Sequence, residues 1–441
     1  MSFHPINTIW ISTEVLFSME ALKCKSVESI LTERDIKSIV HKAASHEWTI
    51  LGYDIKVAGQ GLSGFLGDHF RMTVHLENGN FTKKLHLFAK FLPLLNKPKA
   101  EFIGEYNFFK RENLVYELFE EMGVANEQKA WCPKALIHTD SLIVMPDLSI
   151  EGYKSISHHE CLDLKHVAVV VTSMARFHAS FACFEAKRDM IHHQRNSFYK
   201  DHISVLKESP HFDAPWSEAW LRAAAKLSFN LIQTFSTKIH KHIDDLEEKL
   251  TDLFSKACED LEPSKDSLNV IIHRDLWINN ILFRYEHGHP SEAVLLDFQC
   301  VRYAPPALDL MIFLYLTTTK EFRRAHEKEI FNQYYTVFTQ HLDDTVKSKL
   351  KDYNYGRWDF FNWCERARMF AMVQAMAIFP FTLMSPSLAQ KTFDNPDTFM
   401  KLMEEDRSEP VLAFARECTV YRERQLQVCE EFVDKYILKP L

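Results

Sequence analysis

The residues best suited to chemistry lie in two short motifs between apolar runs. The segment His273-Arg-Asp-Leu-Trp-Ile-Asn-Asn280 follows Val270-Ile-Ile, and an Asp-Phe-Gln begins at Asp297, 22 residues after Asp275. Phosphoryl transfer needs a carboxylate that orients the acceptor hydroxyl and cations that neutralise phosphate oxygens. We expect Asp275 to accept the hydroxyl proton, and Asn280 and Asp297 to hold Mg²⁺, which prefers oxygen ligands. The competing interpretation is a pair of unrelated turns around a core histidine.

A lysine and a glutamate upstream fit the same chemistry. Lys90 stands near the end of the apolar run Leu85–Phe91, where a lysine is costly unless it is paired. Glu105 follows 15 residues later, on an expected helix. A strand lysine that pairs with a helix glutamate and contacts nucleotide phosphates is the kinase arrangement. The alternative is a lysine that reaches solvent at a strand end and a solvated glutamate.

Glycine is scarce, with 11 in the chain, yet four lie within nine residues. The stretch Gly59-Gln-Gly61-Leu-Ser63-Gly64 lets backbone N–H groups approach a phosphate closely. A dinucleotide-binding turn needs a helix directly after it, whereas residues 68–76 alternate like a strand. Strand, loop and strand therefore favour a phosphate-covering flap, and an ordinary glycine-rich hairpin loop is the alternative.

The elements that must position these residues change in character along the chain. Strand-like runs are expected near 50–58, 69–76 and 84–92, with a hairpin turn at Glu77-Asn-Gly-Asn80. A helix is expected from Thr32, another carries Phe102, Tyr106 and Phe109 on one face, and two short runs follow at 134–138 and 142–145. Beyond Asp147 the pattern is helical, apart from a β-like island at 270–297. The order predicts an α+β fold with two lobes, divided into an N-terminal extension (1–34), a nucleotide-binding N-lobe (35–147), and a catalytic and acceptor-binding C-lobe (148–441).

Composition narrows the classes of function. The chain has 441 residues, 46% hydrophobic and 25% charged, with a net charge of −8, which argues against a general nucleic-acid surface. Nine scattered cysteines without a C-x-x-C pair favour reduced thiols over a disulfide framework. No apolar run approaches the roughly 18–20 residues of a membrane span, so we expect a cytoplasmic protein that does not insert into membranes.

Two rival functions remain at this stage. A zinc hydrolase would use histidines, but the pairs at 158–159, 192–193 and 287/289 lack the i, i+4 spacing and nearby acid of a helical zinc site. The other rival is a catalytically silent kinase-fold protein that only binds nucleotide or ligand. The presence of Lys90, Asp275, Asn280 and Asp297 together disfavours it.

The catalytic segment resembles the ecdysteroid kinase-like (CHK kinase-like) family, relatives of choline kinases and aminoglycoside phosphotransferases. The resemblance rests on three motifs: the H-x-D-x-W-x-N-N loop at 273–280, the Asp-Phe-Gln at 297–299, and Arg302-Tyr-x-x-Pro-x-x-Asp309-Leu. Upstream, the likeness includes the Lys90 strand, the Glu105 helix, the hinge at 142–148, and Ala175–Ala179. The resemblance spans roughly 35–330. It implies a two-lobed protein-kinase-like fold and ATP- and Mg²⁺-dependent phosphorylation of a small-molecule alcohol, a steroid in the family's namesake.

Two departures from the family pattern affect individual residues. The family usually has glycine after the loop histidine, where this chain has Arg274. The family often has glutamate before Asp-Leu at the hinge, where this chain has Pro146, which has no N–H to offer an adenine. We therefore expect the nucleotide base near Met145, Asp147 and Leu148, with backbone groups of Met145 or Leu148 as its partners.

The acceptor is less constrained by sequence. A helix expected at 357–380 carries six aromatic residues, which could line an apolar acceptor cleft or belong to the core: Trp358, Phe360, Phe361, Trp363, Phe370 and Phe379. No aromatic cage with neighbouring carboxylates, as a choline-like cation would need, can be assembled from spacing.

Overall fold

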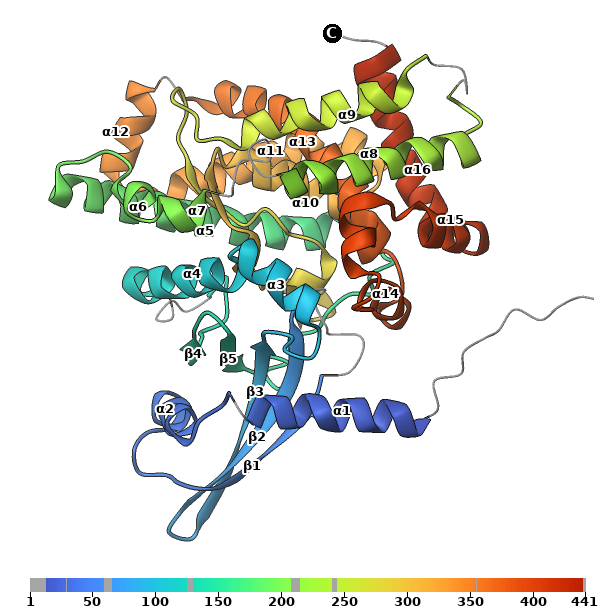
Figure 1. The fold of residues 1–441 in the computed structure, drawn as a ribbon. Coiled ribbons are helices and arrows are strands. Elements are labelled where there is room, and N and C mark those ends of the chain that lie inside the picture. The colour runs from blue at the N-terminus through green and yellow to red at the C-terminus, as the bar shows by residue number, and fades with distance from the viewer. Residues whose placement is uncertain are drawn as a thin grey trace, which may run out of the picture. The chain divides into compact units, whose positions relative to one another are not determined.

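The chain folds into two compact units in the computed structural model (Figure 1). The structure describes residues 13–28, 30–58, 66–124, 130–207, 215–239, 244–353 and 355–438. The first unit comprises Met1–Lys97 and Ala135–Asp147, and the second comprises Pro98–Lys134 and Leu148–Leu441. The first is rich in strands and the second is mainly helical, which confirms the α+β class.

The unit boundary after Asp147 coincides with the expected lobe boundary, but residues 98–134 group with the helical unit instead of the N-lobe. The physical reason lies in α4 (Phe108–Met122), whose buried face packs against the Asp297 turn and the helices α5 and α7. The glycine loop at 59–64, with Gly59, Gly61, Ser63 and Gly64, lies outside the described residues.

A five-stranded antiparallel sheet forms the first unit, in the order β1-β2-β3-β5-β4. Its strands are β1 (Thr49–Val57), β2 (Asp68–Asn78), β3 (Phe81–Phe91), β4 (Ile137–His138) and β5 (Leu142–Pro146). The expected hairpin is confirmed: β2 and β3 pair from Asp68↔Phe91 to Asn78↔Phe81. Gly79 takes the left-handed φ of 59° that this two-residue turn requires.

Two helices belong to the first unit, α1 (Thr13–Glu28) and α2 (Glu33–Ala44). Thr32 begins α2 with a capping box, because its side chain accepts from the N–H of Asp35, whose carboxylate accepts from the N–H of Thr32. Ile36, Ile39 and Val40 then fall on one buried face and join the core formed by β2, β3 and β5. The N-terminal extension is therefore partly helical, and Lys23 of α1 forms an ion pair with Asp68 of β2.

The second unit contains the helices α3 (Lys97–Glu105), whose residues from Pro98 belong to it, and α4 to α16, with two small antiparallel sheets. The helices after α4 are α5 (Leu164–His192), α6 (Ser197–Asp201), α7 (Ile203–Leu206), α8 (Pro215–Phe235), α9 (Leu246–Ala257), α10 (Ala307–Thr317), α11 (Lys320–His341), α12 (Asp344–Asp352), α13 (Arg357–Thr382), α14 (Pro386–Phe393), α15 (Ser408–Glu417) and α16 (Thr419–Val433). One sheet pairs β6 (Val270–Ile272) with β9 (Arg302–Ala304), and the other pairs β7 (Ile281–Glu286) with β8 (His289–Leu295).

Helix α5 is long and apolar enough to cross a membrane by length and composition. In this structure 61% of its most apolar 18-residue window is buried inside the protein. Its neighbours include α11, β8 and β6, so it is accounted for as the core helix of the second unit.

Helix α13 coincides with the expected aromatic helix, and the structure separates its aromatic residues. Phe360, Phe370 and Phe379 are buried in the core, whereas Trp358 is 75% exposed at the start of the helix. The core interpretation therefore holds for the three buried rings.

Candidate active site

The catalytic loop lies between β6 and β7, and buried strands hold both of its ends. Val270, Ile271 and Ile272 are fully buried in β6, and β7 begins at Ile281. The Asp297 turn follows β8 and precedes β9, the partner of β6. The catalytic loop joins β6 to β7, and the Asp297 turn joins β8 to β9. Because β6 pairs with β9 and β7 pairs with β8, the strands that flank one loop are paired with the strands that flank the other. The N–H of Leu296, the residue before Asp297, donates to the carbonyl of Asn280 at 2.9 Å and so connects the two loops.

Asp275 and Asn280 are directly joined. The side-chain amide of Asn280 donates to the backbone carbonyl of Asp275 at 2.8 Å and lies 3.3 Å from the Asp275 carboxylate. Both contacts are made by Nδ2 of Asn280, so its Oδ1 atom takes no part in either bond to Asp275. The structure thus brings together the predicted base and one predicted metal ligand.

His273 is a structural residue of the loop. It is fully buried, its Nδ1 accepts from the N–H of Asp275 at 3.3 Å, and its Nε2 lies 2.7 Å from the carbonyl of Leu296. These partners require a neutral ring with its proton on Nε2. Burial lowers the pKa of His273, against the opposing effect of Asp309, which agrees with the neutral form. His273 therefore links the catalytic loop to the residue before Asp297.

Asp309 anchors the backbone of the catalytic loop. It is fully buried in the first turn of α10, and its carboxylate accepts the N–H groups of His273 and Arg274, both at 2.6 Å. It also lies 3.0 Å from Nε2 of His178 on α5, whose Nδ1 is 2.6 Å from the hydroxyl of Tyr334. A buried carboxylate with three donors is satisfied, so it can hold two successive loop residues in fixed positions.

The Asp297 turn is held by two adjacent residues of α4. Glu112 accepts the N–H of Phe298 at 3.2 Å, and Arg111 donates to the carbonyl of Gln299 at 3.0 Å. The side chain of Gln299 donates to the Asp297 carboxylate at 3.1 Å. Phe298 is fully buried among aromatic rings that include Phe119 and Trp131. Asp297 is therefore a carboxylate on a turn with little freedom to move.

Sequence reasoning missed Glu112. Glu105, the predicted helix glutamate, is exposed at the end of α3, beside Glu404, whose carboxyl pKa is raised by burial, then by Glu105 and Glu405. Glu112 is instead 1% exposed and contacts the turn that carries Asp297. A usable signal was present, because Glu112 lies three or four residues from Phe108, Phe109 and Tyr116 and so shares an apolar helix face with them.

Lys90 occupies the central strand β3 of the first unit, opposite His69 of β2 and Ile143 of β5. It is 4% exposed, which confirms its place in a buried strand. A Cβ atom at Gly67 would stand 2.9 Å from Cγ of Lys90. Gly67, the described member of the glycine cluster, therefore leaves the room that the Lys90 side chain fills.

The predicted hinge residues lie where the chain passes from the first unit to the second, after Asp147. Met145 pairs with Phe88 at the end of β5, and the N–H of Asp147 donates to His86 at 3.0 Å. The Asp147 carboxylate forms an ion pair with Arg71 at 3.2 Å. In the second unit, the carbonyl of Leu148 accepts the N–H groups of Glu151 and Tyr153. Among the predicted hinge groups, the Asp147 N–H and the Leu148 carbonyl are thus already used within the protein.

The described residues contain no group of three or more His, Cys, Asp or Glu side chains that could hold a metal ion. The rings of His158 and His159 lie 3.9 Å apart, tilted by 43°, and belong to no such group.

Comparisons with known proteins place this geometry in context. An uncharacterized kinase-like protein from Caenorhabditis elegans is 38% identical over 73 residues, which are 17% of this chain and 19% of that protein. The match thus spans about a fifth of the length of that curated relative. An ethanolamine kinase structure from Plasmodium vivax is 12% identical, with coverage of 95% of this chain and 93% of its own and a TM-score of 0.44. A choline kinase structure from Streptococcus pneumoniae is 14% identical, with coverage of 78% and 98% and a TM-score of 0.35.

The profile of the ecdysteroid kinase-like family matches residues 62–346, more than half of the chain. The matched region includes Lys90, Glu112, the catalytic loop, the Asp297 turn and Asp309. The resemblance drawn from the catalytic segment is confirmed, and this chain belongs to the ecdysteroid kinase-like family.

Proposed function

We propose that this protein is an ATP-dependent kinase that transfers the γ-phosphoryl group to a hydroxyl of a small molecule, a steroid alcohol such as an ecdysteroid being the acceptor. The observation that carries the proposal is the bonded set of Asp275, Asn280 and the segment leading to Asp297. In the proposal, Asp275 of this set is the base, and Asn280 and Asp297 supply two oxygen ligands. We further propose that it acts in the cytoplasm.

The proposed reaction forms a bond between the acceptor oxygen and the γ-phosphorus and breaks the bond to the β,γ-bridging oxygen, so that ADP leaves. The carboxylate of Asp275 orients the hydroxyl and takes its proton. Asn280 fixes this carboxylate through the bond from its amide, and His273 and Asp309 fix the backbone of the same loop. These residues supply the positioning that phosphoryl transfer chiefly requires.

Asn280 and Asp297 would hold Mg²⁺ in this proposal. The donor set fits the ion, because it consists of one amide oxygen and one carboxylate, and Mg²⁺ in kinases takes few protein ligands beside phosphates and water. The bound ion would neutralise charge on the phosphate oxygens. On the protein side, Gln299 and Glu112 hold the Asp297 turn in the conformation that presents this carboxylate.

Residues of the first unit would bind the nucleotide. Lys90 is the proposed contact of the α- and β-phosphates, and its burial against Gly67 supports a fixed position for the side chain. We propose that backbone groups near Met145 and Leu148 bind adenine and that the glycine loop at 59–64 covers the phosphates. Glu105 was the predicted partner of Lys90; the burial of Glu112 at the Asp297 turn supports Glu112 as the glutamate that serves the catalytic centre.

Asp275→Asn tests the proposed base. The amide keeps the size of the side chain but cannot take the hydroxyl proton, so we expect a loss of about 10²-fold or more in kcat for phosphoryl transfer. Binding of Mg·ATP should change much less. A screen of alcohols, steroids included, with mass detection of the added phosphate identifies the acceptor for this measurement.

Asp266→Asn is the matched control, because Asp266 is exposed in the loop before β6 and the change removes the same charge. It should leave turnover unchanged. Equal turnover in the wild type and Asp275→Asn would show that Asp275 is not the base. Nucleotide binding without phosphate transfer to any alcohol would instead favour the silent binding protein.

A further inference from the structure

Two large apolar side chains that are adjacent in the sequence are exposed at the end of α5. Met190 is 62% exposed and Ile191 is 76% exposed. Both lie in the last turn of the helix, which ends at His192. Because burial of side chains of this size stabilises a folded protein, a pair of them on the surface indicates a place that an apolar partner can cover.

Three basic side chains accompany this apolar pair. Lys187 lies three residues before Met190 and four before Ile191, so it shares their side of the helix. Arg195 follows α5, and Lys200 lies in α6. All three are exposed, and none forms an ion pair with a residue that the structure describes. We call Lys187, Met190, Ile191, Arg195 and Lys200 the α5 corner.

Asp189 fixes the backbone of this corner. Its carboxylate accepts the N–H groups of Asn196 at 3.1 Å and Ser197 at 2.8 Å, and it forms an ion pair with Lys349 of α12 at 3.0 Å. Asp189 is 7% exposed, and its own carbonyl accepts the N–H of His193. The turn between α5 and α6 is therefore well held, so the exposure of the apolar pair is built into the fold.

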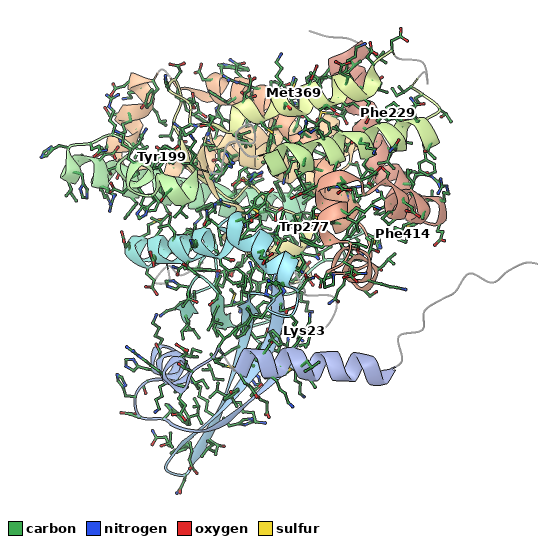
Figure 2. All side chains as sticks on the ribbon, in the orientation of Figure 1. Lys23, Tyr199, Phe229, Trp277, Met369 and Phe414 are labelled. Atoms are coloured by element: carbon green, nitrogen blue, oxygen red, sulfur yellow. The ribbon has the colours of Figure 1, made fainter. Side chains whose placement is uncertain are left out.

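Helix α6 is also held beside α5 (Figure 1). Arg188 of α5 forms an ion pair with Asp201 at 2.7 Å. Tyr199, which Figure 2 labels, stacks on Tyr303 of β9 with the ring centroids 4.7 Å apart. Both acidic residues of this part of the chain, Asp189 and Asp201, thus have cationic partners outside the α5 corner. They do not neutralise its three basic side chains.

An anionic lipid surface complements this combination of charge and apolar area. Basic side chains remain at the headgroups of such a surface, whereas aliphatic side chains enter the boundary with the acyl chains. Positive charge alone would attract any polyanion, so it is Met190 and Ile191 that favour lipid. We propose that the α5 corner docks the protein on an anionic lipid surface, as a peripheral contact in which no helix crosses the bilayer.

The attraction must be local, because the whole chain has a net charge of −8. Salt screens exposed charges beyond about 8 Å at physiological ionic strength, so the side chains nearest the lipid decide the interaction. Glu117 and Glu121 of α4 interact with His202, which lies outside the α5 corner. Docking in this way does not depend on the proposed phosphoryl transfer, so either can fail without the other.

Cosedimentation of the full chain with vesicles tests the docking surface. Phosphatidylcholine vesicles that contain phosphatidylserine should bind the protein about tenfold more tightly than vesicles of phosphatidylcholine alone, because basic residues gain from the anionic headgroups. Met190→Ser/Ile191→Ser should weaken binding to the anionic vesicles by about tenfold, because the aliphatic contact with the acyl boundary is lost. Lys187→Glu/Lys200→Glu should weaken it by about tenfold or more.

Each double variant has a control at an exposed position elsewhere in the second unit. Ile150→Ser removes a side chain that is 64% exposed and is followed by an acid, Glu151. Lys328→Glu reverses the charge of an exposed lysine of α11 that lies between Glu327 and Glu329. Both controls should bind the anionic vesicles as the wild type does.

Three results would overturn the proposal. The first is equal binding of the wild type to both kinds of vesicle, and the second is unchanged binding in Met190→Ser/Ile191→Ser. The third is a loss of binding in the lysine variant alone, which would show a surface for polyanions in general, such as an acidic protein, instead of one for lipid.

Discussion

Arg274 and Asp297 flank the chemistry in backbone conformations that few side chains adopt. Their φ values are 67° and 65°, in the left-handed region. For residues other than glycine this region costs roughly 1–2 kcal/mol. At Arg274 the bond from its N–H to Asp309 offsets the cost. Glycine would take this φ without strain, which explains physically why glycine is usual after the loop histidine in the family that this chain resembles.

Glu185 of α5 is a buried acid that should make stability depend on pH. Burial raises its pKa from 4.5 to about 7, against the hydrogen bond donated by Tyr303, while Asp189 raises it further and Lys349 lowers it. The folded protein therefore binds more protons than the unfolded chain between these values. Stability is highest below pH 4.5 with respect to this group and falls as pH rises toward 7.

Glu185→Gln keeps the size of the side chain and removes its titration. We expect the variant to be more stable than the wild type at pH 8 by up to roughly 3 kcal/mol, with little difference near pH 4. Urea unfolding followed by circular dichroism at both pH values measures this. Glu248→Gln, at an exposed position of α9, is the control. The same change of stability with pH in Glu185→Gln and wild type would contradict the prediction.

At the scale of elements, α4 controls the Asp297 turn through Arg111 and Glu112. Glu112→Ala would leave the buried N–H of Phe298 without its acceptor, which costs about 1–3 kcal/mol. If Asp297 holds the metal as proposed, we expect the Mg²⁺ concentration for half-maximal phosphate transfer to rise about tenfold or more, because this carboxylate loses its fixed turn. Glu112→Gln retains the acceptor oxygen and should rescue most of this loss. An unchanged Mg²⁺ requirement in Glu112→Ala would remove the turn-holding role.

The elements also show how far sequence predicts such a site. The β2–β3 hairpin and the catalytic loop were predictable, because turn residues and apolar strands are local signals. The residue at which α3 ends was not predictable. The chain turns at Asn107, which has a φ of 55°, so that α4 begins a new register. Treating 102–109 as one helix pointed to Glu105, whereas the separate α4 buries Glu112. Local periodicity places Glu112 on an apolar helix face, but it does not show that the helix breaks before Phe108, because the packing of α4 against the Asp297 turn decides where α4 begins.

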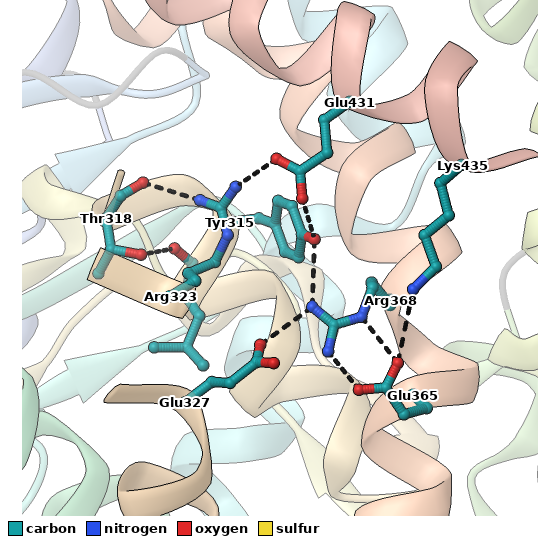
Figure 3. A network of polar contacts seen from close by, with 9 residues as sticks. Tyr315, Thr318, Arg323, Glu327, Glu365, Arg368, Glu431 and Lys435 are labelled. Atoms are coloured by element: carbon teal, nitrogen blue, oxygen red, sulfur yellow. Dashed lines mark hydrogen bonds and ion pairs between the residues drawn. The ribbon is translucent and has the colours of Figure 1, made fainter. Parts of the chain in front are cut away.

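At the scale of the whole chain, buried charged side chains join several helices of the second unit to one another. Figure 3 shows Arg368 of α13 bound to Glu365, Glu327 and Tyr315, and Arg323 bound to Glu431 of α16. Arg368 has three side-chain partners, and Arg323 has the carbonyl of Thr318 beside Glu431, so each buried arginine is bound by more than one acceptor. These bonds connect α16 to α10, α11 and α13, which follow the Asp297 turn in the sequence.

Mg·ATP should stabilise the whole protein if the proposed function holds, because a ligand that binds only the folded state raises its stability by mass action. At a nucleotide concentration of about 100 times Kd, this amounts to roughly 2.7 kcal/mol. A rise in Tm of about 3–5 °C is expected for a chain of this length. Differential scanning fluorimetry with Mg·ATP, and with ATP and EDTA, measures the shift and its dependence on the metal.

Asp297→Asn is the variant for this experiment, since asparagine tolerates the left-handed φ of 65° that alanine would strain. It loses the charged ligand while keeping the turn, so the shift caused by Mg·ATP should fall toward the value with EDTA. Asp266→Asn should keep the full shift. If Asp297→Asn is stabilised as much as the wild type, Asp297 does not hold the metal. If Mg·ATP stabilises neither the wild type nor Asp297→Asn, the proposal that the protein binds ATP is wrong, and the catalytic loop must serve another ligand.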